Sequence, residues 1–156
     1  MKDKEKIVLV ADDIAREGIQ KLTQYFSVHV KTDIDQYDLL NNISKYSGLI
    51  VRSRTKVTSE LIAAGKKLEV VGRCGVGVDN IDIGACKEMG VKVVNCPTSS
   101  TIAVAELTFS LMLGLARKIT YCDREMKEGM WPKKRYVGNE LNGKTLGLVA
   151  VGRIST

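Results

Sequence analysis

The sequence predicts an α/β protein in which a parallel sheet carries helices on both faces. Five short apolar segments recur about every 20 residues, and each is followed by a segment with helical periodicity. Segments such as IVLV (7–10) and GLIV (48–51) are continuous apolar runs, which is typical of parallel strands buried on both faces. This pattern favours a flavodoxin-like sheet, in which ligands bind beyond the carboxyl ends of the strands.

The first strand is expected in KIVLVA (6–11), whose apolar run ends at Asp12 and Asp13. The remaining strands are expected at residues 27–30, 48–52, 68–73 and 91–95. Their carboxyl ends carry polar residues and glycines, so this edge of the sheet is the expected ligand side.

The helices between these strands are predicted from apolar side chains at helical spacing. In residues 14–25 the stripe includes Ile14, Ile19 and Leu22. Thr58 stands three residues before Leu61, where its side chain can cap the first turn of a helix over 58–64. The other two helices are expected at 35–43 and 83–89.

A different organisation begins after Pro97. Residues 98–119 form one long apolar helix, polar at its start and basic at its end. Because it is apolar nearly all round, we expect it to be buried between two bodies. A second helix (121–128) and a final strand (146–151) follow, so we expect domains at 1–97 and 98–156.

Composition excludes several classes of protein. With 44% hydrophobic and 27% charged residues, the chain is typical of a globular protein, and no apolar run reaches the roughly 18 residues of a membrane span. The apolar run near the start is too short for a signal peptide, so no membrane association and a cytoplasmic location are expected. The four cysteines, Cys74, Cys86, Cys96 and Cys122, form no CxxC pair, which predicts reduced, mostly buried thiols and no metal site.

The net charge of +6 is concentrated in residues 115–156, which hold 9 Lys or Arg and 4 Asp or Glu. The segment lacks the interleaved aromatic residues of a nucleic-acid site. We therefore expect a solvated surface, or one covered by acidic sequence, and no nucleic-acid partner.

Two segments at the expected ligand edge suggest anion binding. In GRCGVGVDNID (72–82), glycines around Val76 allow the backbone to present its amides, and Arg73 adds positive charge. In IVRSRTKVT (50–58), Arg52 and Arg54 are two residues apart and suit bidentate binding of phosphate or carboxylate. The alternatives are a strand-to-helix turn with glycines for conformation alone, and arginines on a solvated surface.

A third segment, AVGRIS (150–155), resembles part of a dinucleotide-binding glycine turn. Only Gly152 matches the GxGxxG pattern, at the position that lets backbone approach a pyrophosphate. Ala150 replaces the first glycine and would be strained by about 1 kcal/mol or more at positive φ. The match alone is weak evidence.

Two other candidates are rejected. Asp12 and Asp13 resemble the acidic pair of response-regulator receivers, but Arg52 and Asn95 stand where a receiver needs aspartate and lysine. His29, the only histidine, lies in a short expected strand and is interpreted as structural.

Taken together, five segments resemble the D-isomer-specific 2-hydroxyacid dehydrogenases in order and spacing. They are LIVRSRTKVT, VVGRCGVGVDNID, VKVVNCP, VAELTFSLMLGLAR and the run over 131–154 that ends in GRI. The resemblance covers nearly the whole chain. It implies a flavodoxin-like substrate domain, followed by the first elements of a Rossmann-type NAD-binding domain that is truncated here.

The resemblance also implies roles for individual residues. The implied substrate-binding residues are Arg52, Ser53, Arg73, Val76 and Gly77. The implied cofactor-binding residues are Val76, Gly152, Arg153 and Ile154. No catalytic residue is assigned, because the family's catalytic residues are expected downstream of Thr156.

The implied activity is an NAD-dependent oxidation of a small anionic 2-hydroxy acid. The nearest match within the family implies 3-phospho-D-glycerate and its conversion to 3-phosphooxypyruvate, a step of serine biosynthesis. The full-length form is implied to be a homo-oligomer, and this chain alone is expected to be inactive. The alternative is a non-enzymatic module that binds anions or pairs with an intact subunit.

Overall fold

The computed structural model describes residues 5–131 and 133–156, and Pro132 of the 131–154 run lies outside the described residues. Internal contacts divide the chain into two compact units, one ending at Ser99 and the other beginning at Ser100.

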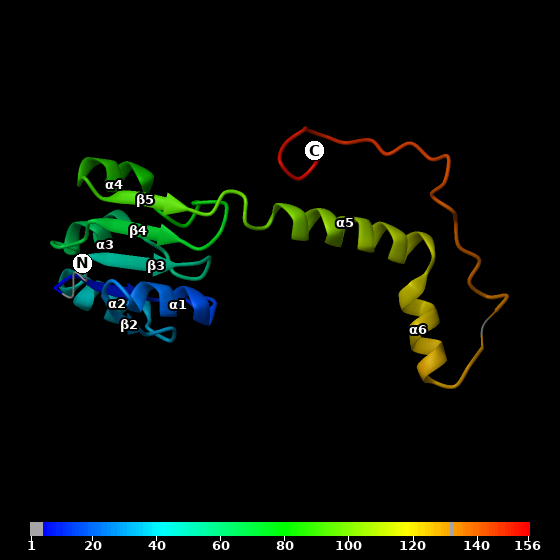
Figure 1. The fold of residues 1–156 in the computed structure, drawn as a ribbon, viewed down its shortest axis with the longest axis horizontal. Coiled ribbons are helices and arrows are strands. Elements are labelled where there is room, and N and C mark those ends of the chain that lie inside the picture. The colour runs from blue at the N-terminus through cyan, green and yellow to red at the C-terminus, as the bar shows by residue number, and fades with distance from the viewer. Residues whose placement is uncertain (1–4, 132) are drawn as a thin grey trace. The chain divides into compact units, whose positions relative to one another are not determined.

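The described part of the first unit contains a five-stranded parallel sheet with the order β2-β1-β3-β4-β5 (Figure 1). The strands are β1 (Ile7–Val10), β2 (Ser27–Val30), β3 (Gly48–Val51), β4 (Val70–Arg73) and β5 (Lys92–Asn95). Val51 pairs with Arg73, and Arg73 pairs with Asn95. The flavodoxin-like order is confirmed, and the register brings the carboxyl ends of β3, β4 and β5 to one edge.

Short helices connect the strands, and polar side chains define where they begin. The helices are α1 (Arg16–Thr23), α2 (Gln36–Asn42), α3 (Ser59–Ala64) and α4 (Ile83–Glu88), and a 3-10 turn η1 (Ile43–Lys45) extends α2. Asp35, Thr58 and Asp82 each accept a hydrogen bond from the amide three residues later. The cap predicted at Thr58 is confirmed, and the ends of elements in this unit lie within two residues of those expected.

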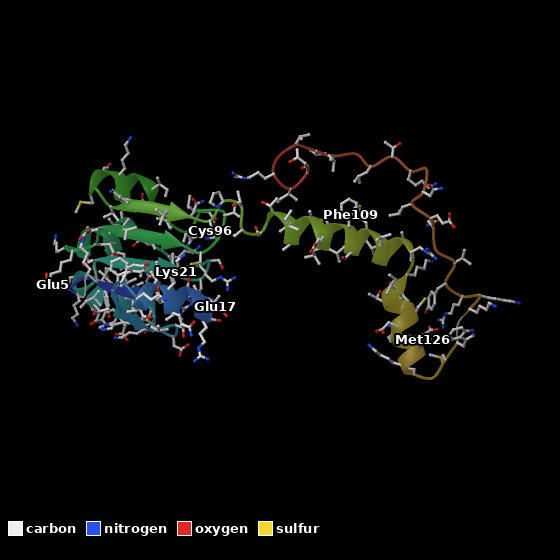
Figure 2. The ribbon with its side chains drawn as sticks, viewed as in Figure 1. Glu5, Glu17, Lys21, Cys96, Phe109 and Met126 are labelled. Atoms are coloured by element: carbon white, nitrogen blue, oxygen red, sulfur yellow. The ribbon has the colours of Figure 1, made fainter. Side chains whose placement is uncertain are left out.

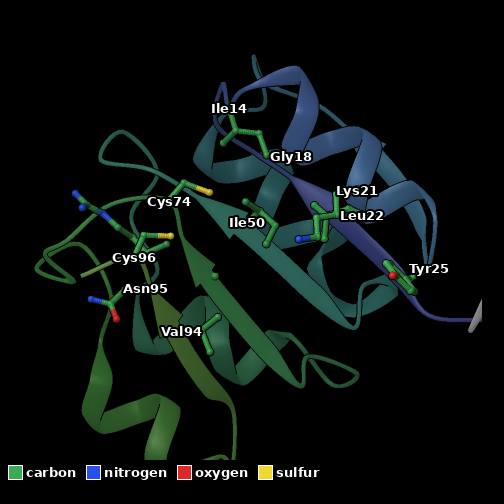
Figure 3. Close-up of a pocket in the computed structure, with 12 residues that line it drawn as sticks. Ile14, Gly18, Lys21, Leu22, Tyr25, Ile50, Cys74, Val94, Asn95 and Cys96 are labelled. Atoms are coloured by element: carbon green, nitrogen blue, oxygen red, sulfur yellow. The ribbon is translucent and has the colours of Figure 1, made fainter. Parts of the chain in front are cut away.

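The two faces of the sheet are covered unequally. On one face, side chains of β1, β3 and β4 pack against α2, α3 and α4, and Leu9, Leu49 and Val71 are fully buried there. On the other face α1 packs beside β2, and a groove of about 400 Å³ lies between α1 and the strands β3 to β5 (Figure 3).

The second unit contains two helices, α5 (Thr101–Ala116) and α6 (Ile119–Lys127). Lys118 separates them with a left-handed backbone, at φ 54°. Glu125 of α6 is buried, and its Oε1 accepts hydrogen bonds from Arg135 Nη1 at 2.8 Å and the Tyr136 hydroxyl at 2.5 Å. This cluster fastens the segment after α6 back onto the helix.

The prediction that helix 98–119 is buried between two bodies is wrong for this chain. The helix starts at Thr101, and none of its residues is buried. Leu107 and Phe109 are 59% and 56% exposed, and Figure 2 shows Phe109 projecting from the helix. Within the second unit only one side of an all-round apolar helix can pack against α6, so the other sides stay exposed.

The predicted strand at 146–151 is also wrong, because the described residues there have no regular structure. Leu146, Leu148 and Val149 are all exposed. A strand needs a neighbour to satisfy its backbone groups, and the described part of the second unit offers none.

Candidate anion-binding site

The carboxyl ends of β3 and β4 open into two loops that carry the predicted substrate residues. Arg52 and Ser53 follow β3 and are exposed. Arg73 ends β4 and is partly buried, and Val76 and Gly77 follow it in an exposed turn. Because β3 and β4 are paired through Val51 and Arg73, both loops leave the sheet from adjacent positions.

Asp12, at the end of β1, holds the β3 loop in place. Its Oδ2 accepts hydrogen bonds from the Arg52 amide at 2.6 Å and the Thr55 amide at 3.2 Å. Its Oδ1 accepts from Thr55 Oγ1 at 2.6 Å and from Arg54 Nε at 3.0 Å. Only 3% of Asp12 is exposed, so the carboxylate serves as a buried hub for this loop.

The ionisation of Asp12 reflects this environment. Burial by itself raises the pKa of the carboxyl, but the hydrogen bonds from Thr55 and Arg52 and the charge of Arg54 together hold the pKa below its usual value. The carboxylate therefore stays charged at neutral pH.

Arg54 does not belong to the anion site, contrary to the sequence prediction that it binds anions with Arg52. Its guanidinium bonds to Asp12 and to the carbonyls of Ala11 at 2.5 Å and Thr32 at 2.6 Å. These contacts pin the β3 loop to the end of β1. The extended-chain argument failed because the backbone turns between Arg52 and Arg54, which sends the two side chains to different partners.

Asn80 braces the same loop from the other side. Its Nδ2 donates to the Arg52 carbonyl at 2.8 Å and to the Thr55 carbonyl at 2.7 Å, and the residue is buried. The β3 loop is thus fixed between β1 and the segment that leads into α4. Sequence reasoning missed this role for Asn80, since only the fold brings it beside residue 52.

The β4 loop presents two backbone amides in one direction. The Gly75 carbonyl accepts from the Cys96 amide at 2.9 Å, and the Val76 carbonyl accepts from Asn95 Nδ2 at 2.6 Å. In a trans peptide the N–H points opposite to the C=O, so the amides of Val76 and Gly77 point away from β5. Neither amide has a hydrogen-bond partner within the described residues.

Arg73 lies against the same loop. A Cβ built on Gly75 would collide with the Arg73 guanidinium, so the absence of a side chain at 75 gives this group its place. The Arg73 Nε is buried and has no partner among the residues that the structure describes. A positive group with an unused donor beside two free amides is suited to a carboxylate or phosphate.

The electrostatics at Cys74 indicate that the arginines of both loops gather here. Burial is the largest cause that raises the pKa of the Cys74 thiol, and Cys96 raises it further. The charges of Arg52 and Arg73 act in the opposite direction and lower it. Both guanidiniums therefore lie within electrostatic range of one side chain at the end of β4.

The predicted cofactor residues Gly152, Arg153 and Ile154 lie in a turn of the second unit. The Ser155 and Thr156 amides both donate to the Gly152 carbonyl at 3.1 Å, and Ala150 adopts φ 68°. Ala150 therefore has the positive φ at which an alanine is expected to be strained. In the described residues no helix follows this turn. Of the four predicted cofactor-binding residues, Val76 belongs to the first unit and the other three belong to the second.

The remaining candidates have structural roles. The rings of His29 and Tyr46 meet edge-on with centroids 5.6 Å apart, and His29 Nδ1 lies 3.4 Å from the Tyr46 hydroxyl. All four cysteines are free, as expected, but the expectation of mostly buried thiols holds only for Cys86. Cys74 and Cys122 are half-buried and Cys96 is exposed, because Cys96 follows β5 at the open edge of the sheet.

The described residues offer neither a metal cluster nor a membrane helix. They contain no group of three or more His, Cys, Asp or Glu placed to hold a metal ion. They also contain no helix with the length and apolar character needed to cross a bilayer.

The fold and these loops define a class of protein: a flavodoxin-like α/β unit with arginines and free amides at the carboxyl edge of its sheet, joined to a second unit. Residues 8–151 match the catalytic domain of the D-isomer specific 2-hydroxyacid dehydrogenases. The chain belongs to this family.

Curated relatives agree with this assignment. The chain is 47% identical over 148 residues to D-3-phosphoglycerate dehydrogenase of Archaeoglobus fulgidus, covering 94% of this chain and 28% of the relative. It is also 47% identical over 147 residues to the enzyme of that name from Methanocaldococcus jannaschii, with coverage of 94% and 28%. The chain thus spans little more than a quarter of the length of these relatives.

Solved structures show the same architecture. The TT0316 protein from Thermus thermophilus superimposes with a TM-score of 0.88 at 30% identity, covering 96% of this chain and 50% of that one. The NAD+-bound 3-phosphoglycerate dehydrogenase of Entamoeba histolytica superimposes with a TM-score of 0.74 at 30% identity, with coverage of 97% and 48%.

Proposed function

We propose that this chain provides the substrate-binding side of an NAD-dependent D-3-phosphoglycerate dehydrogenase. The single observation that supports this most directly is the β4 loop, where two free amides stand beside Arg73. In this proposal the amides of Val76 and Gly77 bind the substrate carboxylate, and Arg52, Ser53 and Arg73 bind the anionic groups of the substrate. The relatives named above carry this activity.

Anion binding can be tested without the rest of an enzyme. Titrating isotope-labelled chain with 3-phospho-D-glycerate should shift the backbone amide signals of Val76 and Gly77 in an NMR spectrum. Arg73→Gln removes a charge-assisted interaction of about 1.5–3 kcal/mol, so it should weaken binding by about 10- to 100-fold. Arg52→Gln should act in the same direction.

The matched control is Lys56→Gln, which removes an exposed positive charge close to the site in sequence. It should leave the affinity within about twofold, since an exposed charge without a direct contact to the ligand is screened by water and salt. Equal affinity of wild type and Arg73→Gln, or shifts that avoid residues 76 and 77, would count against the site. D-glycerate as a second ligand separates carboxylate binding from phosphate binding.

NAD is the proposed cofactor, and residues of this chain are suited to bind its nicotinamide and its pyrophosphate. The Val76 backbone would face the nicotinamide, while Gly152 and the amides of Arg153 and Ile154 would bind the pyrophosphate. Those two amides have no partner in the described structure, which is the state that phosphate binding requires. When bound, the cofactor accepts hydride from the substrate.

We further propose that this chain alone does not catalyse the oxidation. Such a reaction needs a base for the hydroxyl proton. The only histidine contacts Tyr46 from β2, which β1 and β3 separate from β4 in the sheet. NADH formation from 3-phospho-D-glycerate by the purified chain would contradict this.

A second candidate function is subunit pairing, favoured by the exposed apolar side chains of α5. Large side chains on several sides of this helix are more than half exposed, among them Ile102, Leu107 and Leu111. Patches of this kind mark interaction surfaces. Co-purification with a full-length D-3-phosphoglycerate dehydrogenase, lost in the Leu107→Gln, Leu111→Gln double variant, would support it; equal recovery of the variant would contradict it.

A further inference from the structure

Two cysteines directly follow the ends of neighbouring strands beside the proposed anion site. Gly72 of β4 pairs with Val94 of β5 in the sheet register. Cys74 follows the last residue of β4 and Cys96 follows the last residue of β5, and both line the groove beside α1. Figure 3 shows both side chains directed into that groove.

The general spacing of neighbouring strands is compatible with a disulfide between residues that directly follow them. Neighbouring strands are about 4.8 Å apart, and disulfides form across Cα separations of roughly 4.4–6.8 Å. The Cys96 amide donates to the Gly75 carbonyl at 2.9 Å, so β5 stays beside the β4 loop at this level. The electrostatic influence of Cys96 on the Cys74 thiol is consistent with this proximity.

The two thiols differ in a way that suits stepwise oxidation. Cys96 is exposed, so a small oxidant in solution can reach it directly. Cys74 is half-buried, and burial keeps its pKa above the usual value of a thiol although the charges of Arg52 and Arg73 act to lower it, so Cys74 stays mostly protonated at neutral pH. One thiol is therefore accessible to an oxidant, and its neighbour is placed to react with the product.

We propose that Cys74 and Cys96 form a reversible redox pair that a peroxide oxidises to an intramolecular disulfide. The Cys96 thiolate attacks the peroxide oxygen, which gives a Cys96 sulfenic acid and, after protonation of the leaving group, water or an alcohol. The Cys74 thiolate then attacks the Cys96 sulfur and releases a second water. Two thiols lose two electrons and two protons, and the peroxide is reduced by the same two electrons.

The disulfide would connect the loop after β4 with the segment that follows β5. Cys74 immediately precedes the loop with the free amides, and Cys96 lies four residues before the second unit begins at Ser100. The disulfide would tie this loop to the start of the connection between units. Its formation does not depend on the proposed dehydrogenase function, so failure of one leaves the other standing.

The test counts thiols in the purified, reduced 156-residue chain before and after excess hydrogen peroxide. Ellman's reagent under denaturing conditions should detect four thiols before oxidation and two after it. The intact mass should fall by two hydrogen atoms, the chain should stay monomeric on a non-reducing gel, and dithiothreitol should restore four thiols.

Variants assign the bridge. Cys74→Ser should leave a Cys96 sulfenic acid that dimedone captures, and Cys96→Ser should abolish the rapid loss of two thiols. The matched control Cys122→Ser removes a half-buried thiol of the second unit, and Cys86→Ala removes the remaining one. Both controls should still form the bridge and go from three thiols to one.

Some results would overturn the proposal. Wild-type chain that keeps four thiols under peroxide would do so, as would a bridge that persists in Cys74→Ser or Cys96→Ser. A disulfide-linked dimer in place of the internal bridge would also contradict it. Circular dichroism of each reduced variant checks that the sheet is intact, and the mass of the linked peptides in wild type identifies the bridge without any substitution.

Discussion

At the scale of single residues, the position of the β3 loop depends on buried polar groups that hold it in place. Asp12 accepts four hydrogen bonds from residues 52–55, and Asn80 donates to two carbonyls of the same loop. The Asn80 Oδ1 is buried without a partner among the described residues, which opposes the stabilisation from these bonds, because an unpaired buried group costs about 1–3 kcal/mol.

Asp12→Asn should therefore destabilise the first unit. The amide group cannot accept from all four donors, so the free energy of unfolding should fall by about 2–3 kcal/mol at neutral pH. The native pKa of Asp12 is lowered, so its contribution is complete above the unfolded pKa of about 3.9 and is lost as the pH falls through the native value. Urea unfolding at pH 7 and pH 3 should show a difference between wild type and variant that shrinks in acid.

Asp13→Asn is the control for this experiment, since the neighbouring Asp13 side chain is exposed. Its unfolding free energy should stay within about 0.5 kcal/mol of wild type. A difference between wild type and Asp12→Asn that is equally large at both pH values would show that the charge of Asp12 is not the stabilising feature.

Gly75→Ala tests the position of Arg73. The added methyl group would displace the guanidinium, so binding of 3-phospho-D-glycerate should weaken, by about 10-fold if the charge-assisted contact is lost. The flexible side chain can move aside, and the free energy of unfolding should change by less than about 1 kcal/mol. Gly84→Ala, in α4, is the control and should bind the anion like wild type, as an NMR titration of both variants would show.

At the scale of elements, each helix of the sheet unit depends on its first turn. Asp35 Oδ1 accepts from the Asp38 amide at 2.7 Å at the start of α2, which has only seven residues. So short a helix gains little from its own propagation and depends on its cap and on packing. Asp35→Ala should lower the free energy of unfolding by about 1 kcal/mol, measured by urea denaturation.

Asp33→Ala removes an exposed carboxylate two residues earlier and serves as the comparison. It should unfold within about 0.5 kcal/mol of wild type. Equal destabilisation by both substitutions would indicate a general charge effect instead of a capping effect.

The elements also show which features could be predicted from sequence. The strands of the first unit and the cap at Thr58 depend on local apolar runs and spacing, so pattern alone located them. The flavodoxin-like order followed from the repeat, and the loop after β4 followed from its glycines. Arg54 was misjudged because its partner Asp12 lies 42 residues away in sequence, and no local pattern reports such a contact.

The second unit was predicted less well for a physical reason. The sequence of α5 predicts a helix with apolar side chains on all sides, and the helix is present. The sequence does not show which other segment packs against those side chains. Residues 146–151 have the composition of a buried strand, yet strand structure needs a paired neighbour, and no described element of this unit supplies one. The helix of α5 was therefore predicted correctly, whereas its burial and the strand at 146–151 were not, because both depend on tertiary partners.

At the scale of the whole molecule, stability resides in one of the two units. Every residue of the hydrophobic core cluster lies in the first unit, between Ile7 and Val93. In the second unit Glu125 is the only buried residue among those described, and it is polar. Since burial of apolar surface is the main favourable term in folding, the first unit should fold by itself.

We therefore expect residues 1–99, produced alone, to unfold cooperatively with a urea midpoint close to that of the full chain. Circular dichroism of the full chain should show the same unfolding transition for the first unit. It should also show a separate, less cooperative loss of helix signal from α5 and α6. Limited trypsin digestion offers an independent measurement, because residues 115–156 hold nine Lys or Arg, and the described residues of this unit contribute nothing to the hydrophobic core cluster. Early cuts there with a resistant amino-terminal fragment would agree with this expectation. A fragment 1–99 that fails to fold would contradict the expectation and show that the first unit needs residues 100–156 for its stability.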